Sequence, residues 1–387
     1  MKTKELLERF SRVASPSGYE YMAEPDIRKI IDGYFQEVFD EVFFDKFGGV
    51  RLGKHASTVG RDDPGAPHIK SCVNFSGHQI YGALGSSRPT KIMFDAHIDQ
   101  VGLVVSEILD GGFLRVKPLG GLDLNILPAS EFYVYTYEEN EPFIFSNQSN
   151  RKIPAVAVSV PPHLKKTTGD NLPKLDDIYL DTGYDSKDEL EKIVRIGSPV
   201  TFKSDFLSLE NNLFSCAGMD DRLCGLILML AVKSLKNKPE ADIYIVLSTS
   251  EETRNPGAAN AAYEIQPDFA VALDVDFSRD PGIDATDAIE MGKGAGITYS
   301  AATNIKLTKK IISLAKDKKI PVQINALPAD TSTNADTIQI TGEGIPCALV
   351  SVPLKNMHTF NEICSLKDIE TTVELVKTII ENAGDLI

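Results

Sequence analysis

The stretch 91-KIMFDAHID-99 places an apolar run directly before a histidine and an aspartate, and it decides how the rest of the chain is interpreted. Residues 91–95 form a short apolar run of the kind that is buried in a sheet. His97 and Asp99 follow at its carboxyl end, where open α/β sheets carry their functional side chains. The stretch therefore predicts a buried strand that delivers polar groups to a site.

The same arrangement recurs three times, at apolar runs that predict strands over 243–247, 269–273 and 348–352. An apolar helix predicted over 221–235 also begins with acidic residues. The ionisable residues at these positions are Asp220, Asp221, Glu251, Glu252, Asp274 and His358. Because the carboxyl ends of parallel strands meet at one edge of a sheet, we expect these side chains to lie together.

Strands alternate with helices beyond residue 215, which predicts an α/β fold with a mostly parallel central sheet flanked by helices. Residues 104–202 differ, because short β-rich pieces and turn residues follow one another there. We therefore expect a discontinuous catalytic domain, 1–103 and 203–387. A small β-barrel or sandwich of residues 104–202 is inserted into it.

The remaining elements are predicted from periodicity and capping residues. Amphipathic helices are expected near 6–13, 27–35, 258–263 and 305–316, and strands within 38–52 and at 322–325. Ser365 is the expected N-cap of a final helix over 366–383. Residues 54–90 lack periodicity and are interpreted as an irregular excursion.

The composition excludes several classes of partner. The 387 residues carry a formal net charge of −15 and no basic run, which argues against binding of nucleic acid or an anionic membrane. No apolar stretch is long enough to span a membrane, and the first residues lack the apolar core of a signal peptide. The five cysteines are scattered, which favours free thiols and a cytoplasmic location.

Two imidazoles among several carboxylates suit divalent Zn, Co or Mn. A carboxylate bridges two metal ions more simply than an imidazole does, so one aspartate shared by two ions, each with a histidine and a further carboxylate, is the simplest arrangement. Glu251 and Glu252 are adjacent, and in an extended backbone their side chains would point opposite ways. One of them can then bind metal while its neighbour accepts a proton from water.

The motifs together resemble the tetrahedral (TET) dinuclear aminopeptidases, the glutamyl/leucyl aminopeptidase family that forms dodecameric shells. The resemblance rests on motifs in the right order over most of the chain: 15-SPSGYE-20, 96-AHID-99, 120-GG-121, 179-YLDTG-183, 220-DDR-222, 251-EE-252, 273-LDV-275, 292-GKG-294 and 357-MH-358. It implies a zinc-peptidase-like fold and release of N-terminal residues from peptides.

The resemblance also implies a role for each candidate residue. His97 and Asp274 would hold one of two divalent ions, Glu252 and His358 the other, and Asp220 would bridge them through a cis Asp220–Asp221 peptide. Asp99 would orient His97, and Glu251 would be the general base. The inserted domain would mediate subunit contacts in a homo-oligomer, a dodecamer by resemblance.

Five residues depart from the family pattern beside the site: Gln100, Arg254, Asn334, Lys355 and Asn356. None is a predicted ligand, so they bear on substrate preference and assembly. An acidic substrate side chain would need a cation, for which Lys293, Arg254 and Lys355 are the candidates.

Three other functions fit parts of the sequence. A dinuclear deacylase of small amino-acid derivatives would differ only in its specificity pocket. A metal-independent glycosidase needs two carboxyl groups flanking one bond, and it would leave both histidines without a role. A non-enzymatic assembly protein would not need intact ligands and a base.

Overall fold

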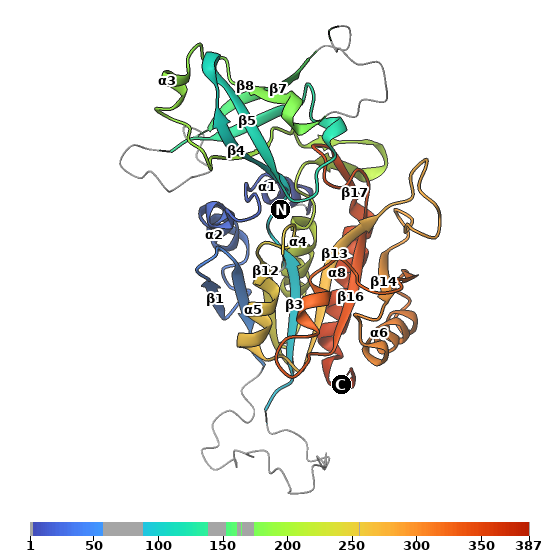
Figure 1. The fold of residues 1–387 in the computed structure, drawn as a ribbon. Helices are drawn as coiled ribbons and strands as arrows, with labels where there is room; N and C mark the ends of the chain where they lie inside the picture. Colours follow the sequence, from blue (N-terminus) through green and yellow to red (C-terminus); the bar gives the residue numbers. More distant parts are fainter. Residues whose placement is uncertain are drawn as a thin grey trace, which may run out of the picture.

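The computed structural model describes residues 3–56, 88–137, 152–160, 164, 174–254 and 256–386. In these residues an eight-stranded sheet with helices on both faces lies below a closed six-stranded barrel (Figure 1). The strands of the sheet are, in spatial order, β1 (Glu41–Phe44), β2 (Val50–Lys54), β12 (Asp242–Ser248), β3 (Lys91–His97), β13 (Phe269–Phe277), β16 (Cys347–Leu354), β14 (Ala295–Tyr299) and β15 (Val322–Ala326).

The four central strands β12, β3, β13 and β16 run parallel, as the sequence predicts. Their register sets Ser248 opposite His97 and Ala272 opposite Asp95. The carboxyl ends of these strands therefore meet at one edge, which faces the barrel (Figure 1). The outer strands make the sheet mixed, because β1 and β2 pair antiparallel, as do β14 and β16.

Alternate residues of the central strands pack against different helices. Ile92 and Phe94 share the large core with α1 (Thr3–Ser11), α2 (Glu24–Tyr34), α4 (Arg222–Lys233), α6 (Ile305–Asp317) and α8 (Leu366–Glu381). Met93 packs on the other face with α5 (Pro256–Ile265) and α7 (Ala335–Ile338). Helix α4 is almost wholly apolar and is buried along most of its length. None of the described helices is both long and apolar enough to cross a membrane.

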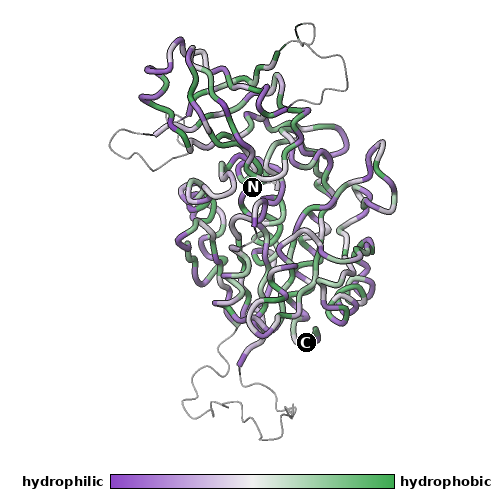
Figure 2. The backbone as a smooth tube through the Cα atoms, viewed as in Figure 1, coloured by the Kyte–Doolittle hydropathy of each residue, from purple (hydrophilic) through white to green (hydrophobic). Residues whose placement is uncertain are grey.

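The barrel strands follow the order β4-β5-β8-β7-β6-β9. Their bounds are β4 (Gly102–Ile108), β5 (Phe113–Leu119), β6 (Glu131–Tyr135), β7 (Lys152–Ser159), β8 (Ile178–Asp181) and β9 (Pro199–Phe202). Hydrophobic and hydrophilic residues alternate along them in Figure 2, and the apolar ones form the barrel core. The barrel thus begins at Gly102, two residues before the insertion predicted from the sequence.

Smaller elements lie within the barrel segment and after it. Helix α3 (Lys187–Leu190) follows Ser186, whose hydroxyl caps it. A three-stranded sheet of β10 (Leu207–Ser208), β11 (Leu213–Cys216) and β17 (Glu362–Ser365) follows the barrel.

The sequence-based expectations hold for most elements, with three differences. The predictions did not include α7, β10, β11, β14 or β17; β14 is a short strand that is preceded by Gly294 and contains Gly296. Ser365 precedes α8 as expected, but its side chain makes no capping hydrogen bond. Most of the excursion predicted over 54–90 lies outside the described residues, since 57–87 are not described.

Candidate metal centre

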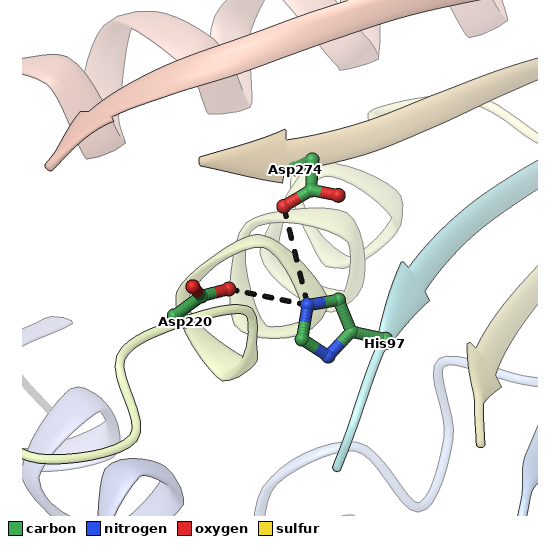
Figure 3. Close-up of side chains that lie close together, drawn as sticks. All are labelled: His97, Asp220 and Asp274. Atoms are coloured by element: carbon green, nitrogen blue, oxygen red, sulfur yellow. Dashed lines mark hydrogen bonds and ion pairs between the residues drawn. The ribbon is translucent and has the colours of Figure 1, made fainter. Parts of the chain in front are cut away.

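One group of possible ligands forms where β3, β13 and the turn before α4 meet. His97 ends β3, and its Nε2 lies 3.1 Å from Asp220 Oδ1 and 4.0 Å from Asp274 Oδ1. Figure 3 shows both carboxylates pointing at the same ring nitrogen. All three side chains are buried, and their candidate ligand atoms lie within 4.8 Å of one another. The group has the size and the donor atoms of a divalent-metal site.

A second group shares Asp220 with the first. His358 Nε2 lies 3.2 Å from Asp220 Oδ2 and 3.2 Å from Glu252 Oε2. The two carboxylate oxygens of Asp220 thus face two different histidines. The Asp220–Asp221 peptide is cis, as expected.

Both histidines are oriented through the other ring nitrogen. Nδ1 of His97 lies 3.0 Å from the carbonyl oxygen of Asp99, and Nδ1 of His358 lies 2.7 Å from that of Gly121. A carbonyl only accepts hydrogen bonds, so Nδ1 carries a proton in each ring, and Nε2, the nitrogen that faces Asp220, is the one a metal ion would take after its proton is lost. Gly121 follows barrel strand β5, so the barrel contributes directly to this geometry.

Buried carboxylates hold the loops that carry these residues. Asp99 accepts hydrogen bonds from the backbone N–H groups of Glu251 at 3.0 Å and Glu252 at 3.1 Å. Glu362 accepts from the N–H groups of Asp220 at 3.2 Å and His358 at 3.0 Å, one with each oxygen. Asp99 was expected to orient His97, and its carboxylate oxygen does lie 3.5 Å from Nδ1. Its closer contacts are with the Glu251–Glu252 turn.

The pKa of each carboxylate in the two groups reflects its burial and its charged neighbours. Burial alone would raise the pKa of Asp220, but hydrogen bonds from His358 and His97 hold it well below its ordinary value. Burial raises the pKa of Glu252 and of Asp274 well above theirs, and nearby Asp220 and Asp221 add to this. Glu252 Oε1 is buried and has no hydrogen-bond partner among the described residues. Crowded carboxylates with an orphaned oxygen fit a cation, because each such group is costly to bury alone.

Glu251 lies beside the first group. Its Oε2 is 4.0 Å from His97 Nε2, and it lines the same cavity of about 540 Å³ as the candidate ligands. Glu251 and Glu252 lie in a turn rather than in the extended backbone considered from the sequence. They nevertheless reach different places, since Glu252 contacts His358 and Glu251 approaches His97.

The model of the M42 glutamyl aminopeptidase family matches residues 78–375. The chain is 31% identical to the lysyl aminopeptidase of Pyrococcus furiosus over 97% of this chain and 96% of that protein.

Two solved structures agree with that match. An aminopeptidase from the archaeon Desulfurococcus kamchatkensis superimposes with a TM-score of 0.81, at 26% identity, over 98% of this chain and 94% of that one. The TET1 peptidase of Pyrococcus horikoshii, which can assemble into a tetrahedron or a large octahedral shell, has a TM-score of 0.76 at 23% identity, over 98% and 99% of the two chains.

The chain belongs to the M42 aminopeptidase family. It is therefore a metal-dependent aminopeptidase, a hydrolase that acts on peptides.

Three of the residues at which this M42 enzyme departs from the family pattern make side-chain hydrogen bonds. Gln100 accepts a hydrogen bond from the buried Arg222. Asn334 donates to Asp95 at 2.7 Å and to Ser248 at 2.9 Å. Asn356 donates to the carbonyl of Asn361 at 3.2 Å.

The three cations considered for an acidic substrate do not line the cavity. Lys355 pairs with Asp280 at 2.5 Å. Arg254 and Lys293 are likewise absent from the described lining, although Arg254 follows the Glu251–Glu252 turn closely in the chain. The structure thus gives no support to an acidic preference based on these residues.

The sequence analysis did not assign a role to several residues that surround the M42 site. They are Glu20, Gly121, Asp276 and Glu362. Asp276 could have been found, because it lies two residues beyond Asp274 on the same strand and hence on the same face. The carbonyl of Gly121 has no side-chain signature, and Glu362 reaches the site only through strand pairing with Cys216.

Proposed function

We propose that this aminopeptidase uses two divalent ions per chain, with Glu251 as its general base. The observation that carries the proposal is that Asp220 belongs to both groups of ligands. One of its carboxylate oxygens faces His97 and the other faces His358. His97, Asp220 and Asp274 would hold one ion, and Asp220, Glu252 and His358 the other. The nitrogen and oxygen donors favour Zn or Co, with Mn as a further candidate.

The chain's own residues supply the proton transfers in this proposal. When bound, the two ions supply a water of lowered pKa and a polarised substrate carbonyl. Glu251, at the wall of the cavity, takes a proton from the attacking water and later delivers it to the leaving amine. Asp99 holds the backbone of Glu251 and so fixes the base relative to His97.

We further propose a preference for cationic N-terminal side chains. Asp276 and Asp336 line the cavity beyond the candidate ligands, whereas no lysine or arginine does so within the described part of the chain. Burial raises the pKa of Asp276, and the side-chain amide of Asn325, on the edge strand β15, donates a hydrogen bond to it at 3.2 Å. The similarity to a lysyl aminopeptidase supports the same preference.

A panel of aminoacyl p-nitroanilides tests this preference. We expect the ratio of kcat/KM for lysyl over leucyl substrate to fall about tenfold in Asp276→Asn, because one cavity charge is lost. Asp287→Asn removes an exposed carboxylate outside the cavity lining and should leave the ratio unchanged. A wild-type preference for glutamyl substrate would contradict the assignment.

Chelation and the choice of substrate together separate the two main rival functions from the proposal. We expect a chelator to abolish hydrolysis of free-amine substrates and Co or Zn to restore it. A deacylase would instead require N-acyl amino acids, and a glycosidase would cleave a glycan whether or not the chelator is present. The crowding of the carboxylates around two histidines favours the peptidase over the glycosidase.

We propose that the inserted barrel, predicted as residues 104–202, mediates homo-oligomer assembly. The shells formed by the Pyrococcus horikoshii relative support this, and light scattering at the mass of a dodecamer would agree with it. A monomer at micromolar concentration would exclude it. The cytoplasmic location stays a prediction.

A further inference from the structure

The turn that carries Glu251 and Glu252 needs external support. It lies between β12 and α5 and belongs to neither element. Ser250, directly before Glu251, has a left-handed backbone with φ of 60°. A non-glycine residue adopts this conformation at a cost, so the surrounding structure must hold it.

Two carboxylates from elsewhere in the chain provide that support. Glu20 Oε1 accepts hydrogen bonds from the backbone N–H of Ser250 at 2.8 Å and from its hydroxyl at 3.1 Å. Asp99 accepts from the next two N–H groups, those of Glu251 and Glu252. Three consecutive backbone N–H groups of the turn therefore donate hydrogen bonds to two buried carboxylates. Glu20, one of the two, is only 2% exposed.

Glu20 is itself fixed from several sides. Its Oε1 also accepts from the backbone N–H of Gly18 at 3.0 Å. A Cβ on Gly48 would lie 2.5 Å from the carbonyl carbon of Glu20, so the hairpin between β1 and β2 packs directly on this backbone. The hydroxyl of neighbouring Tyr19 donates to the carbonyl of Gly197 at 2.7 Å, which anchors the segment to the barrel region.

A second contact joins the same two segments. The hydroxyls of Ser17 and Thr253 lie 3.0 Å apart. The loop of residues 15–20 thus contacts the turn at Ser250 and at Thr253, on both sides of the Glu251–Glu252 pair.

We propose that Glu20 is a positioning residue for catalysis: it holds Ser250 in place and thereby directs Glu251 into the cavity. This inference rests on the proposed role of Glu251 as the base. Asp99 alone would fix two amides, but the start of the turn would be free to pivot at Ser250. A displacement of about 1 Å of a catalytic group can lower the rate roughly a hundredfold.

Two variants separate position from charge. Glu20→Gln keeps the length of the side chain and an oxygen that accepts from Ser250, whereas Glu20→Asp keeps the charge but withdraws the oxygen by one methylene. We expect Glu20→Asp to lower kcat about 10- to 100-fold with KM nearly unchanged, and Glu20→Gln to stay within about threefold of wild type. Bound metal is measured in both.

Asp368→Asn and Asp368→Glu are the matched controls. The carboxylate of Asp368 is likewise buried and accepts from the backbone N–H groups of Gly292 at 2.6 Å and Gly294 at 2.9 Å, in a turn outside the described cavity lining. These controls should change the melting temperature but leave kcat of the folded enzyme unchanged.

Glu251→Gln in the same assay distinguishes the two possible failures. If it is inactive while Glu20→Asp has wild-type kcat, the positioning role alone is wrong. A Glu20→Gln variant as impaired as Glu20→Asp would also overturn it, since an oxygen kept at the same distance from Ser250 would then fail to preserve the rate. If Glu251→Gln is fully active, the proposed base is wrong.

Discussion

The two halves of the candidate metal centre are built from different parts of the fold. The half around His97 lies on β3 and β13, and His97 is 2% exposed. In the other half the side chain of His358 is 31% exposed, lies in a turn with φ of 62°, and is held by Gly121 and Glu362. Groups on sheet strands are placed more rigidly than groups on loops. We therefore expect the two halves to bind metal with different strength.

Removing each histidine separately gives the largest expected effect. His97→Ala and His358→Ala should each lower kcat/KM at least about a hundredfold, because each removes a ligand of a centre that polarises the substrate. His358→Ala should keep one tightly bound ion per chain, measured by elemental analysis. Equal loss of metal in both variants would remove the distinction between the halves.

Stepwise removal of metal from the wild-type enzyme by a chelator tests the same difference in affinity between the two halves, without a mutation. The ion of the His358 half should leave first, because its ligands are more exposed. Titration with a chelator should therefore show loss of activity while about one ion per chain remains. Simultaneous release of both ions would mean that Asp220 couples the halves too strongly for them to act separately.

A smaller effect is expected from the barrel, which reaches the His358 half through Gly120 and Gly121. Gly120 has φ of 85°, and a Cβ there would lie 2.9 Å from Val101 Cγ1 and 3.3 Å from Glu252 Cβ. Gly120→Ala should weaken the more exposed ion about three- to tenfold by displacing Glu252. The control is Gly183→Ala, where φ is 74° but no atom lies within 4 Å of the added carbon. If both variants affect the metal equally, backbone strain rather than the contact is responsible.

Residues at the ends of strands could be predicted from the sequence, whereas residues that act through distant backbone contacts could not. His97 and Asp274 were found because each lies at or near the carboxyl end of an apolar strand, a pattern that periodicity reveals directly. His358 was found in the same way, beyond the apolar run 348–352, but the assignment of all the ligands to two ions around Asp220 depended on the resemblance to a known family. Glu20 and Glu362 act through contacts far apart in the chain, with backbone N–H groups that have no side-chain signature.

The central claim is that Glu251 transfers protons at a centre of two ions that it does not itself hold. Glu251→Gln, analysed for bound metal and for hydrolysis of lysyl p-nitroanilide in the same preparation, tests it most directly. We predict two ions per chain and a kcat about 10²- to 10⁴-fold below wild type. Wild-type activity, or the loss of an ion together with activity, would contradict the claim.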